Sequence, residues 1–278
     1  MLKNIFITGD NHGDFSRYRN IEQQYWSNET GIIVLGDFSI NFYLSKTDTR
    51  KKEELMENYP FYFYVIRGNH EARPQNLPGI QLIYDYNVQG HVYYEEAFPR
   101  IRYFMDYGVY NIKGYNCLII GGAYSVDKKW RLDRVGLTEQ TNIPKQSGWF
   151  NDEQLTQLEM TNCMSLVKAL NINNQKIDFI MSHTCPTSFQ PVDMVLGFID
   201  QSTVDNSMEN FIEKIIHSID WNIYLFGHYH ADRIELPHVE QYYYNIDNID
   251  TIFNRWKLYD NDGEIDWYLK KGPKFYDR

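Results

Sequence analysis

A chain of 278 residues, of which 43% are hydrophobic, is long enough to bury a sizeable core in one large domain. We therefore expect a single domain over residues 1–278. The formal net charge of -10 excludes a broad basic surface, so we do not expect extended binding to a nucleic-acid backbone.

The three cysteines, Cys117, Cys163 and Cys185, are an odd number spread far apart, which favours a reducing compartment over a disulfide framework. The chain has no CxxC pair, so a thiolate zinc site is not expected.

No apolar run approaches the length of a membrane span, and a cleaved N-terminal signal would remove Asp10 and His12. We expect a cytoplasmic protein that does not associate with membranes. The sequence does not indicate its oligomeric state.

The first 70 residues predict three buried strands, each ending in polar side chains. The strands are expected at 2–8, 32–35 and 61–66, where apolar residues predominate. Between them, apolar residues at helical spacing over 15–25 and a charged segment over 45–58 predict two helices. The side chains that follow the three strands are Asp10 and His12, Asp37, and then Asn69 and His70.

The middle of the chain changes to tyrosine-rich pieces broken by glycine, asparagine and proline. Residues 79–112 predict short antiparallel strands. A continuous apolar run at 117–120 predicts another buried strand. The charged residues 127–134 that follow it are expected to form a loop that borders the site.

The remaining residues predict two helices, each leading into a buried strand. The first helix is expected to begin near Asn151 and the second to cover 208–219, and each carries an apolar stripe, which is clearer in the second. They precede strands at 177–182 and 223–226, which run into His183 and into His228 and His230. Residues from about 231 to 278 predict mostly β-hairpin, with a turn at 261–263 between strands at 256–259 and 265–268. The stripe residues of the first helix are Leu155, Leu158, Leu166, Val167 and Leu170.

These elements predict an α/β fold, a two-sheet sandwich flanked by helices, with a site beyond the strand ends where loops converge. Of the eight histidines, five directly follow buried apolar runs, and only His91, His217 and His238 do not. Histidines scattered through a core or over a surface would not sort in this way. The pattern indicates metal ligands collected at one end of the sheets.

Five motifs occur along the chain in a fixed order. They are Asp10-Asn11-His12, Gly36-Asp37, Gly68-Asn69-His70-Glu71, Ser182-His183 and Gly227-His228-Tyr229-His230. In these motifs the chain resembles the calcineurin-like metallophosphoesterases, from about residue 5 to residue 230. The resemblance implies a metallophosphoesterase-like fold and a centre of two divalent metal ions.

By this resemblance, one metal would be held by Asp10, His12, Asp37 and His230, and the other by Asp37, Asn69, His183 and His228, with Asp37 bridging. Carboxylate, carboxamide and imidazole ligands without thiolate suit manganese, iron, zinc or nickel, and we expect manganese. Two divalent ions beside two aspartates keep a surplus of positive charge. We therefore expect the site to bind the phosphate group of a small phosphate ester.

The resemblance also implies a reaction, in which a hydroxide bridging the metals attacks phosphorus and His70, outside the ligand set, protonates the leaving oxygen. We expect hydrolysis of a phosphodiester, either a nucleotide or a related small molecule. One alternative is a phosphomonoesterase, including a serine/threonine protein phosphatase. The other is a non-catalytic binding module built on the same fold.

A departure from the phosphatase pattern favours the diester. In the serine/threonine phosphatases the second motif continues as Gly-Asp-x-x-Asp-Arg-Gly, whereas Ile40 and Asn41 stand here in the places of the second aspartate and the arginine. A phosphomonoester carries close to two negative charges, which suit a guanidinium, and a diester carries only one. Arg67 and Arg131 are the candidates for contact with substrate. The sequence does not indicate what orients His70.

Overall fold

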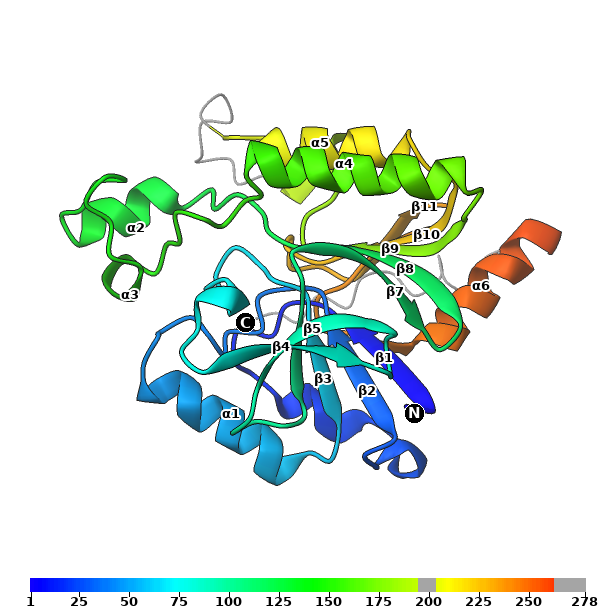
Figure 1. The fold of residues 1–278 in the computed structure, drawn as a ribbon, viewed down its shortest axis with the longest axis horizontal. Helices are drawn as coiled ribbons and strands as arrows, with labels where there is room; N and C mark the ends of the chain where they lie inside the picture. Colours follow the sequence, from blue (N-terminus) through cyan, green and yellow to red (C-terminus); the bar gives the residue numbers. More distant parts are fainter. Residues whose placement is uncertain (195–203, 263–278) are drawn as a thin grey trace.

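The computed structural model describes residues 1–194 and 204–262, in which two β-sheets pack face to face with helices on their outer sides (Figure 1). The predicted two-sheet α/β sandwich is confirmed. The core between the sheets holds apolar side chains from both, such as Ile7 and Ile33 from one sheet and Ile119 and Leu225 from the other.

The first sheet is centred on parallel strands that are buried on both faces, as their continuous apolar runs predict. Its order is β13 (Ile246–Asn248), β1 (Asn4–Thr8), β2 (Thr30–Val34), β3 (Tyr62–Val65), β6 (Ile101–Phe104), β5 (Gly90–Glu95) and β4 (Ile80–Asp85). Strands β1, β2, β3 and β6 run in one direction, so their carboxyl ends share one edge. Side chains alternate between faces: Ile33 packs into the core between the sheets, whereas Ile32 and Val34 pack into the outer layer.

The second sheet is also mixed and has four parallel strands in its middle. Its order is β11 (Arg233–Leu236), β12 (Val239–Gln241), β10 (Trp221–Phe226), β9 (Ile177–Ser182), β8 (Tyr115–Ile120) and β7 (Tyr107–Ile112). Strands β8, β9, β10 and β12 run parallel, and β7 and β11 pair antiparallel at the edges. The predicted antiparallel strands of 79–112 are present, although β6 also pairs parallel with β3.

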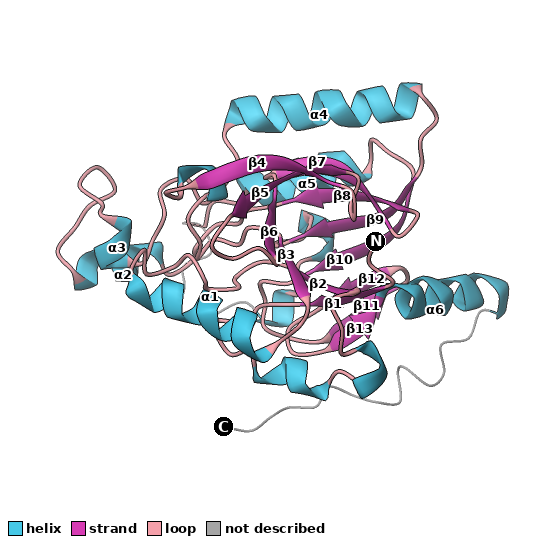
Figure 2. Cartoon of the chain, turned by 60° about the horizontal axis from the view of Figure 1, so that its bottom comes forward, coloured by secondary structure: helices cyan, strands magenta, loops and turns pink. Residues whose placement is uncertain are grey.

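Helices cover the outer faces of both sheets (Figure 2). Helix α1 (Lys46–Asn58) lies on the first sheet and starts at the N-cap Ser45, as predicted. Helices α4 (Gln157–Ile172) and α5 (Ser207–Ile216) lie on the second sheet, and α5 buries the expected apolar stripe. The short helices α2 (Lys128–Arg134) and α3 (Pro144–Ser147) project from the body, whereas the sequence predicted a loop over 127–134.

Two of the predicted helices differ in form from the expectation. Over 15–25 the chain forms two 3₁₀ turns, Ser16–Asn20 and Gln23–Tyr25, because Ile21 between them is extended. Helix α4 begins six residues later than predicted, since Thr156 and Glu159 form a capping box there. Of the predicted stripe, Val167 and Leu170 are buried in α4 and Leu166 packs against the same core, but Leu158 is 70% exposed. Met160 and Cys163 complete the buried face of the helix.

The prediction of a C-terminal hairpin is wrong for residues 256–259, which lie in helix α6 (Ile249–Asp262). Ile249, Ile252 and Trp256 are buried along one side of this helix, and the Trp256 indole donates a hydrogen bond to the buried Glu240 carboxylate at 2.6 Å. The second predicted strand, 265–268, lies outside the described residues. A hairpin does occur earlier, where β11 pairs with β12.

Within the described ranges, no helix is long and apolar enough to cross a membrane. The three cysteines are free thiols and are buried.

The capping box of α4 gives a test of local stability. Thr156→Ala should lower the free energy of unfolding by about 0.5–2 kcal/mol, because the Thr156 hydroxyl accepts a hydrogen bond from the Glu159 backbone. Thr161→Ala in the same helix is the matched control and should change stability by less than about 0.5 kcal/mol, since its hydroxyl bonds only an already helical carbonyl. Urea unfolding measures both, and equal effects would contradict the capping role.

Candidate metal centre

The loops that leave β1 and β10 bring three ligand-type side chains together. The Nε2 atoms of His12 and His230 lie 2.8 Å apart, although the two residues are 218 positions apart in the chain. Asp10 Oδ2 lies 3.3 Å from His230 Nε2 and 3.7 Å from His12 Nε2. Asp10 is buried and both histidines are exposed, so this group of atoms is open to solvent on the histidine side.

A second group lies beside the first and shares Asp10 with it. The ligand atoms of Asp10, Asp37 and His183 all lie within 4.8 Å of one another, and the three side chains are buried. His183 Nδ1 donates a hydrogen bond to the Leu35 carbonyl at 2.7 Å, so in a neutral ring Nε2 carries the lone pair. That lone pair faces Asn69 Oδ1 at 2.9 Å and Asp37 Oδ1 at 3.7 Å.

His228 completes the set of seven predicted ligands. Its ring centroid lies 4.9 Å from that of His183, and its backbone N–H donates to Asp10 Oδ1 at 2.9 Å. Burial lowers the pKa of His228 to about 3, so its imidazole is neutral near pH 7. Asp10 is the member common to the two groups of atoms, whereas the family resemblance implies that Asp37 bridges the metals.

Glycine precedes the first ligand residue in four of the five loops because no side chain fits there. A β-carbon built on Gly9 would lie 2.1 Å from the Tyr242 carbonyl oxygen. A β-carbon would lie 2.1 Å from His183 Nδ1 if built on Gly36, 2.0 Å from Asp37 Oδ1 on Gly68, and 2.5 Å from Asp10 Oδ1 on Gly227. Real β-carbons do not approach other atoms so closely. The glycines of the sequence motifs are therefore required by the packing of the loops around the ligands.

The ligand backbones themselves are strained. His12, Asp37, His228 and His230 have left-handed φ angles of 48°, 48°, 70° and 54°. Such a conformation costs a residue other than glycine on the order of 1–3 kcal/mol and persists only where the surroundings hold it. Four such residues around one point are typical of a functional site.

The chain matches the family model of the calcineurin-like phosphoesterases over residues 3–232. It belongs to this family. Among solved structures, it is similar to a phosphopantetheinyl hydrolase from Mycobacterium tuberculosis, with 13% identity, coverage of 95% of this chain and 94% of that chain, and a TM-score of 0.43. A protein of unknown function from Aquifex aeolicus has 13% identity, coverage of 65% and 80%, and a TM-score of 0.27. No curated protein matches the chain.

The charge states in this calcineurin-like phosphoesterase are those that metal ligands need. Burial alone would raise the pKa of Asp10 and of Asp37, but neighbouring imidazoles outweigh it and hold both carboxyl groups below their usual range. Both aspartates are therefore ionised. At His230 the Asp10 carboxylate outweighs burial and raises the pKa of the imidazole.

The residues fit a cation. Asp10 Oδ2 is buried and accepts no hydrogen bond within the described part of the chain. When the His183 ring is neutral, its Nε2 lone pair faces two oxygen atoms, one of them on an ionised carboxylate. Lone pairs that face one another in a buried site are stabilised by a positive charge between them, and nitrogen and oxygen donors suit the divalent metals that this family implies.

His70 and Arg131 meet beside the ligands. Arg131 Nη2 and Asn69 Nδ2 each lie 3.3 Å from His70 Nε2, and the His70 backbone N–H donates to Asp37 Oδ1 at 2.9 Å. Burial lowers the pKa of His70. Because both groups near Nε2 are donors, the neutral His70 ring accepts there. Arg131 thus comes within reach of this centre, as the sequence suggested.

Arg67 does not face the centre. Its side chain is buried, Nε donates to Asp106 Oδ1 at 2.6 Å, and Nη1 donates to the Glu153 carbonyl at 2.7 Å. A guanidinium held in this way has no path to a substrate at the metals. In the described part of the chain, Arg67 instead binds buried protein groups.

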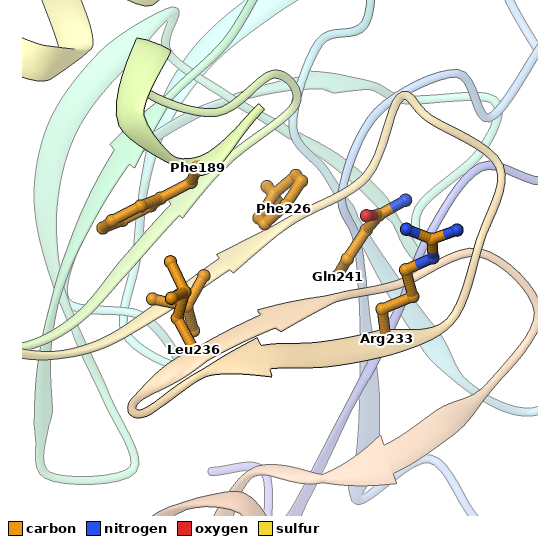
Figure 3. Close-up of a pocket in the computed structure, with 6 residues that line it drawn as sticks. Phe189, Phe226, Arg233, Leu236 and Gln241 are labelled. Atoms are coloured by element: carbon orange, nitrogen blue, oxygen red, sulfur yellow. The ribbon is translucent and has the colours of Figure 1, made fainter. Parts of the chain in front are cut away.

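A pocket beside β10, β11 and β12 is too small for a substrate. Figure 3 shows the side chains of Phe189, Phe226 and Leu236 at one end and the polar groups of Arg233 and Gln241 at the other. Its volume of about 20 Å³ has room for roughly one water molecule. The open side of the metal centre, at His12 and His230, is the better place for a phosphate ester.

Four residues that hydrogen-bond to the ligand loops were not predicted to do so from the sequence. Arg17 is buried and donates to the Asp10 carbonyl at 2.8 Å, and Glu71 accepts from the backbones of Ser39 at 2.9 Å and Gly68 at 3.2 Å. The other two are Ser125 and Glu153, which contact Asn69 directly or through one hydrogen bond. Only Glu71 lies in a motif, so only Glu71 carried a signal in the sequence.

Gly36→Ala should disrupt the site, because its β-carbon would overlap the His183 ring and its φ is +94°. Gly79→Ala is the matched control: Gly79 also has a left-handed φ, of +74°, but has nothing within 4 Å of a built β-carbon. Thermal and urea unfolding should give a cost of about 1–2 kcal/mol for Gly79→Ala and a cost larger by about 1–3 kcal/mol for Gly36→Ala. Equal costs would mean that backbone conformation, and not the approach of His183, explains the glycine.

Proposed function

We propose that this chain is a phosphodiesterase that uses two divalent metal ions and acts on a small diester such as a nucleotide. The observation that carries the proposal is the meeting of two groups of ligand atoms at Asp10. A non-catalytic binding module on this fold would not need to keep all seven ligands together. The free cysteines favour a reducing compartment, and we propose a cytoplasmic location.

The ligand sets of the proposal are those implied by the family. One ion would be held by Asp10, His12, Asp37 and His230, the other by Asp37, Asn69, His183 and His228, and manganese is our first choice. When bound, such ions lower the pKa of water and offset the charge of the phosphate group. The exposed side of the centre, at His12 and His230, admits the ester.

In this proposal His70 holds and delivers the proton that the leaving oxygen needs. Its lowered pKa makes its protonated form a stronger acid than a free imidazolium. Its main chain is fixed by the hydrogen bond to Asp37, and its Nε2 is directed toward Asn69 and Arg131 at the edge of the ligand set. The ring therefore stands beside the ligands, and the neutral ring must first take up a proton before it can pass one to an ester bound there.

His70→Asn should lower kcat by roughly 10²- to 10⁴-fold and leave the metal content unchanged, because the residue is outside the ligand set. The loss should shrink for esters with very good leaving groups, which need little protonation. His217→Asn is the control, since His217 is exposed and pairs only with Glu213 on the same helix face. A loss of equal size for good and poor leaving groups would show that His70 positions the substrate instead.

Two observations support a diester. Ile40 and Asn41, which stand where the protein phosphatases have an aspartate and an arginine, are buried and cannot contact a substrate. Arg131 is paired through Nε with both oxygens of Asp127 at 2.8 Å, so much of its charge is already balanced. The monoesterase remains the second candidate because Arg131 Nη2 reaches His70.

The manganese-loaded protein should hydrolyse a bis(nitrophenyl) diester with a kcat/KM at least about tenfold above that of the nitrophenyl monoester, or about 1.4 kcal/mol of transition-state binding. Asp127→Asn should move this ratio toward the monoester, because it frees the Arg131 charge. Asp133→Asn removes an exposed ion pair of the same helix and should leave the ratio unchanged. A tenfold preference for the monoester in the unmodified protein would replace the diester with the second candidate.

A further inference from the structure

The side-chain amide of Asn69 has two ends of similar size, and only one can bind a metal. Its Oδ1 lies 2.9 Å from His183 Nε2, toward the proposed second metal. Its Nδ2 points the other way, donates to Ser125 Oγ at 2.8 Å and lies 3.3 Å from His70 Nε2. If the amide turned over, the NH₂ group would face the ligands and repel a cation. Something must therefore hold the amide in one orientation.

A buried chain of hydrogen bonds supplies that orientation. Ser125 Oγ lies 2.5 Å from Glu153 Oε2, and the Ser125 backbone N–H donates to Glu153 Oε1 at 3.1 Å. The carboxylate can only accept, so the Ser125 hydroxyl must donate to it and is left to accept from its other neighbour. That neighbour, Asn69, must then present its NH₂ group. Asn69, Ser125 and Glu153 are only 2%, 1% and 3% exposed, so water does not offer a substitute partner.

We propose that Ser125 and Glu153 are positioning residues that fix the Asn69 amide with its oxygen toward the metal centre. The proposal rests on the proposed metal-dependent function and extends it to two residues outside all five motifs. Partners of this kind, which orient a metal ligand without touching the metal, typically change metal affinity or activity by 10- to 100-fold when removed.

Glu153 also contacts Arg67, the residue just before the motif that contains Asn69. The Glu153 carbonyl accepts from Arg67 Nη1 at 2.7 Å, so Glu153 contacts Arg67 with its main chain while its side chain acts on Asn69 through Ser125. Ser125 and Glu153 also stand at the two ends of the arm, residues 126–152, which carries α2 and α3 (Figure 1). The hydrogen bonds between Ser125 and Glu153, which orient Asn69, therefore also join the two ends of the arm that carries Arg131.

The test is a calorimetric titration of Mn²⁺ into the metal-free protein and into two variants, Ser125→Ala and Glu153→Gln. Ser125→Ala removes the closer of the two acceptors that face the Asn69 NH₂ group, leaving His70 Nε2 at 3.3 Å. Glu153→Gln keeps the shape but removes the acceptor-only end of the chain. Because burial raises the pKa of Glu153 to about 7, the titration is made at pH 8. Ser147→Ala is the matched control, since Ser147 is a buried, hydrogen-bonded serine of the same arm that contacts Asn142 and not Asn69.

We expect one of two Mn²⁺ ions to bind roughly 10- to 100-fold more weakly in both variants, while the other ion and the Ser147→Ala control keep their affinities. The unfolding temperature of the metal-free protein is measured alongside. Equal weakening of both ions together with a lower unfolding temperature would mean a merely structural role and would overturn the proposal. So would unchanged affinities in either variant. If the unmodified protein bound no Mn²⁺, the proposed function itself would fail, which is a distinguishable result.

Discussion

The structure depends on the approach of five loops to Asp10 and Asp37, which is so close that three glycines have no room for a side chain. Parallel strands in each sheet make this approach feasible, because they release their loops at the same edge. The approach forces four ligands into left-handed backbone conformations. The buried layers on both sides of the sheets, filled by α1, α4 and α5, offset that cost.

Much of the fold could be predicted because buried parallel strands are continuous apolar runs with few other interpretations. The apolar stripe of α5 was equally clear. The errors lie where tertiary contacts decide the local structure. Residues 256–259 contain aromatic side chains typical of a strand, but in α6 Trp256 packs inward and donates to Glu240. Helix α4 starts where Thr156 and Glu159 form reciprocal hydrogen bonds. Asn151 is also a residue type that caps helices, and for this reason the helix was predicted to start too early.

The gathering of the proposed ligands could be predicted because each lies within a few residues of a strand end, where geometry leaves little freedom of placement. Their supporting residues could not, because Arg17, Ser125 and Glu153 reach the ligands only through the fold. Arg67 shows that a place just after a strand does not by itself predict where a side chain points. It also follows a strand, but its side chain turns into the buried pair with Asp106. Arg131, placed on a predicted loop, is held by helix α2 within 3.3 Å of His70 Nε2.

The central claim is that the seven ligands form one centre for two metal ions. Anomalous diffraction from a crystal of the protein soaked in Mn²⁺ tests it most directly, since it locates the ions without reference to activity. The account predicts two peaks roughly 3.5–4 Å apart, one near Asp10, His12 and His230 and one near Asn69, His183 and His228, with Asp37 between them. A single peak, or peaks away from these side chains, would contradict it.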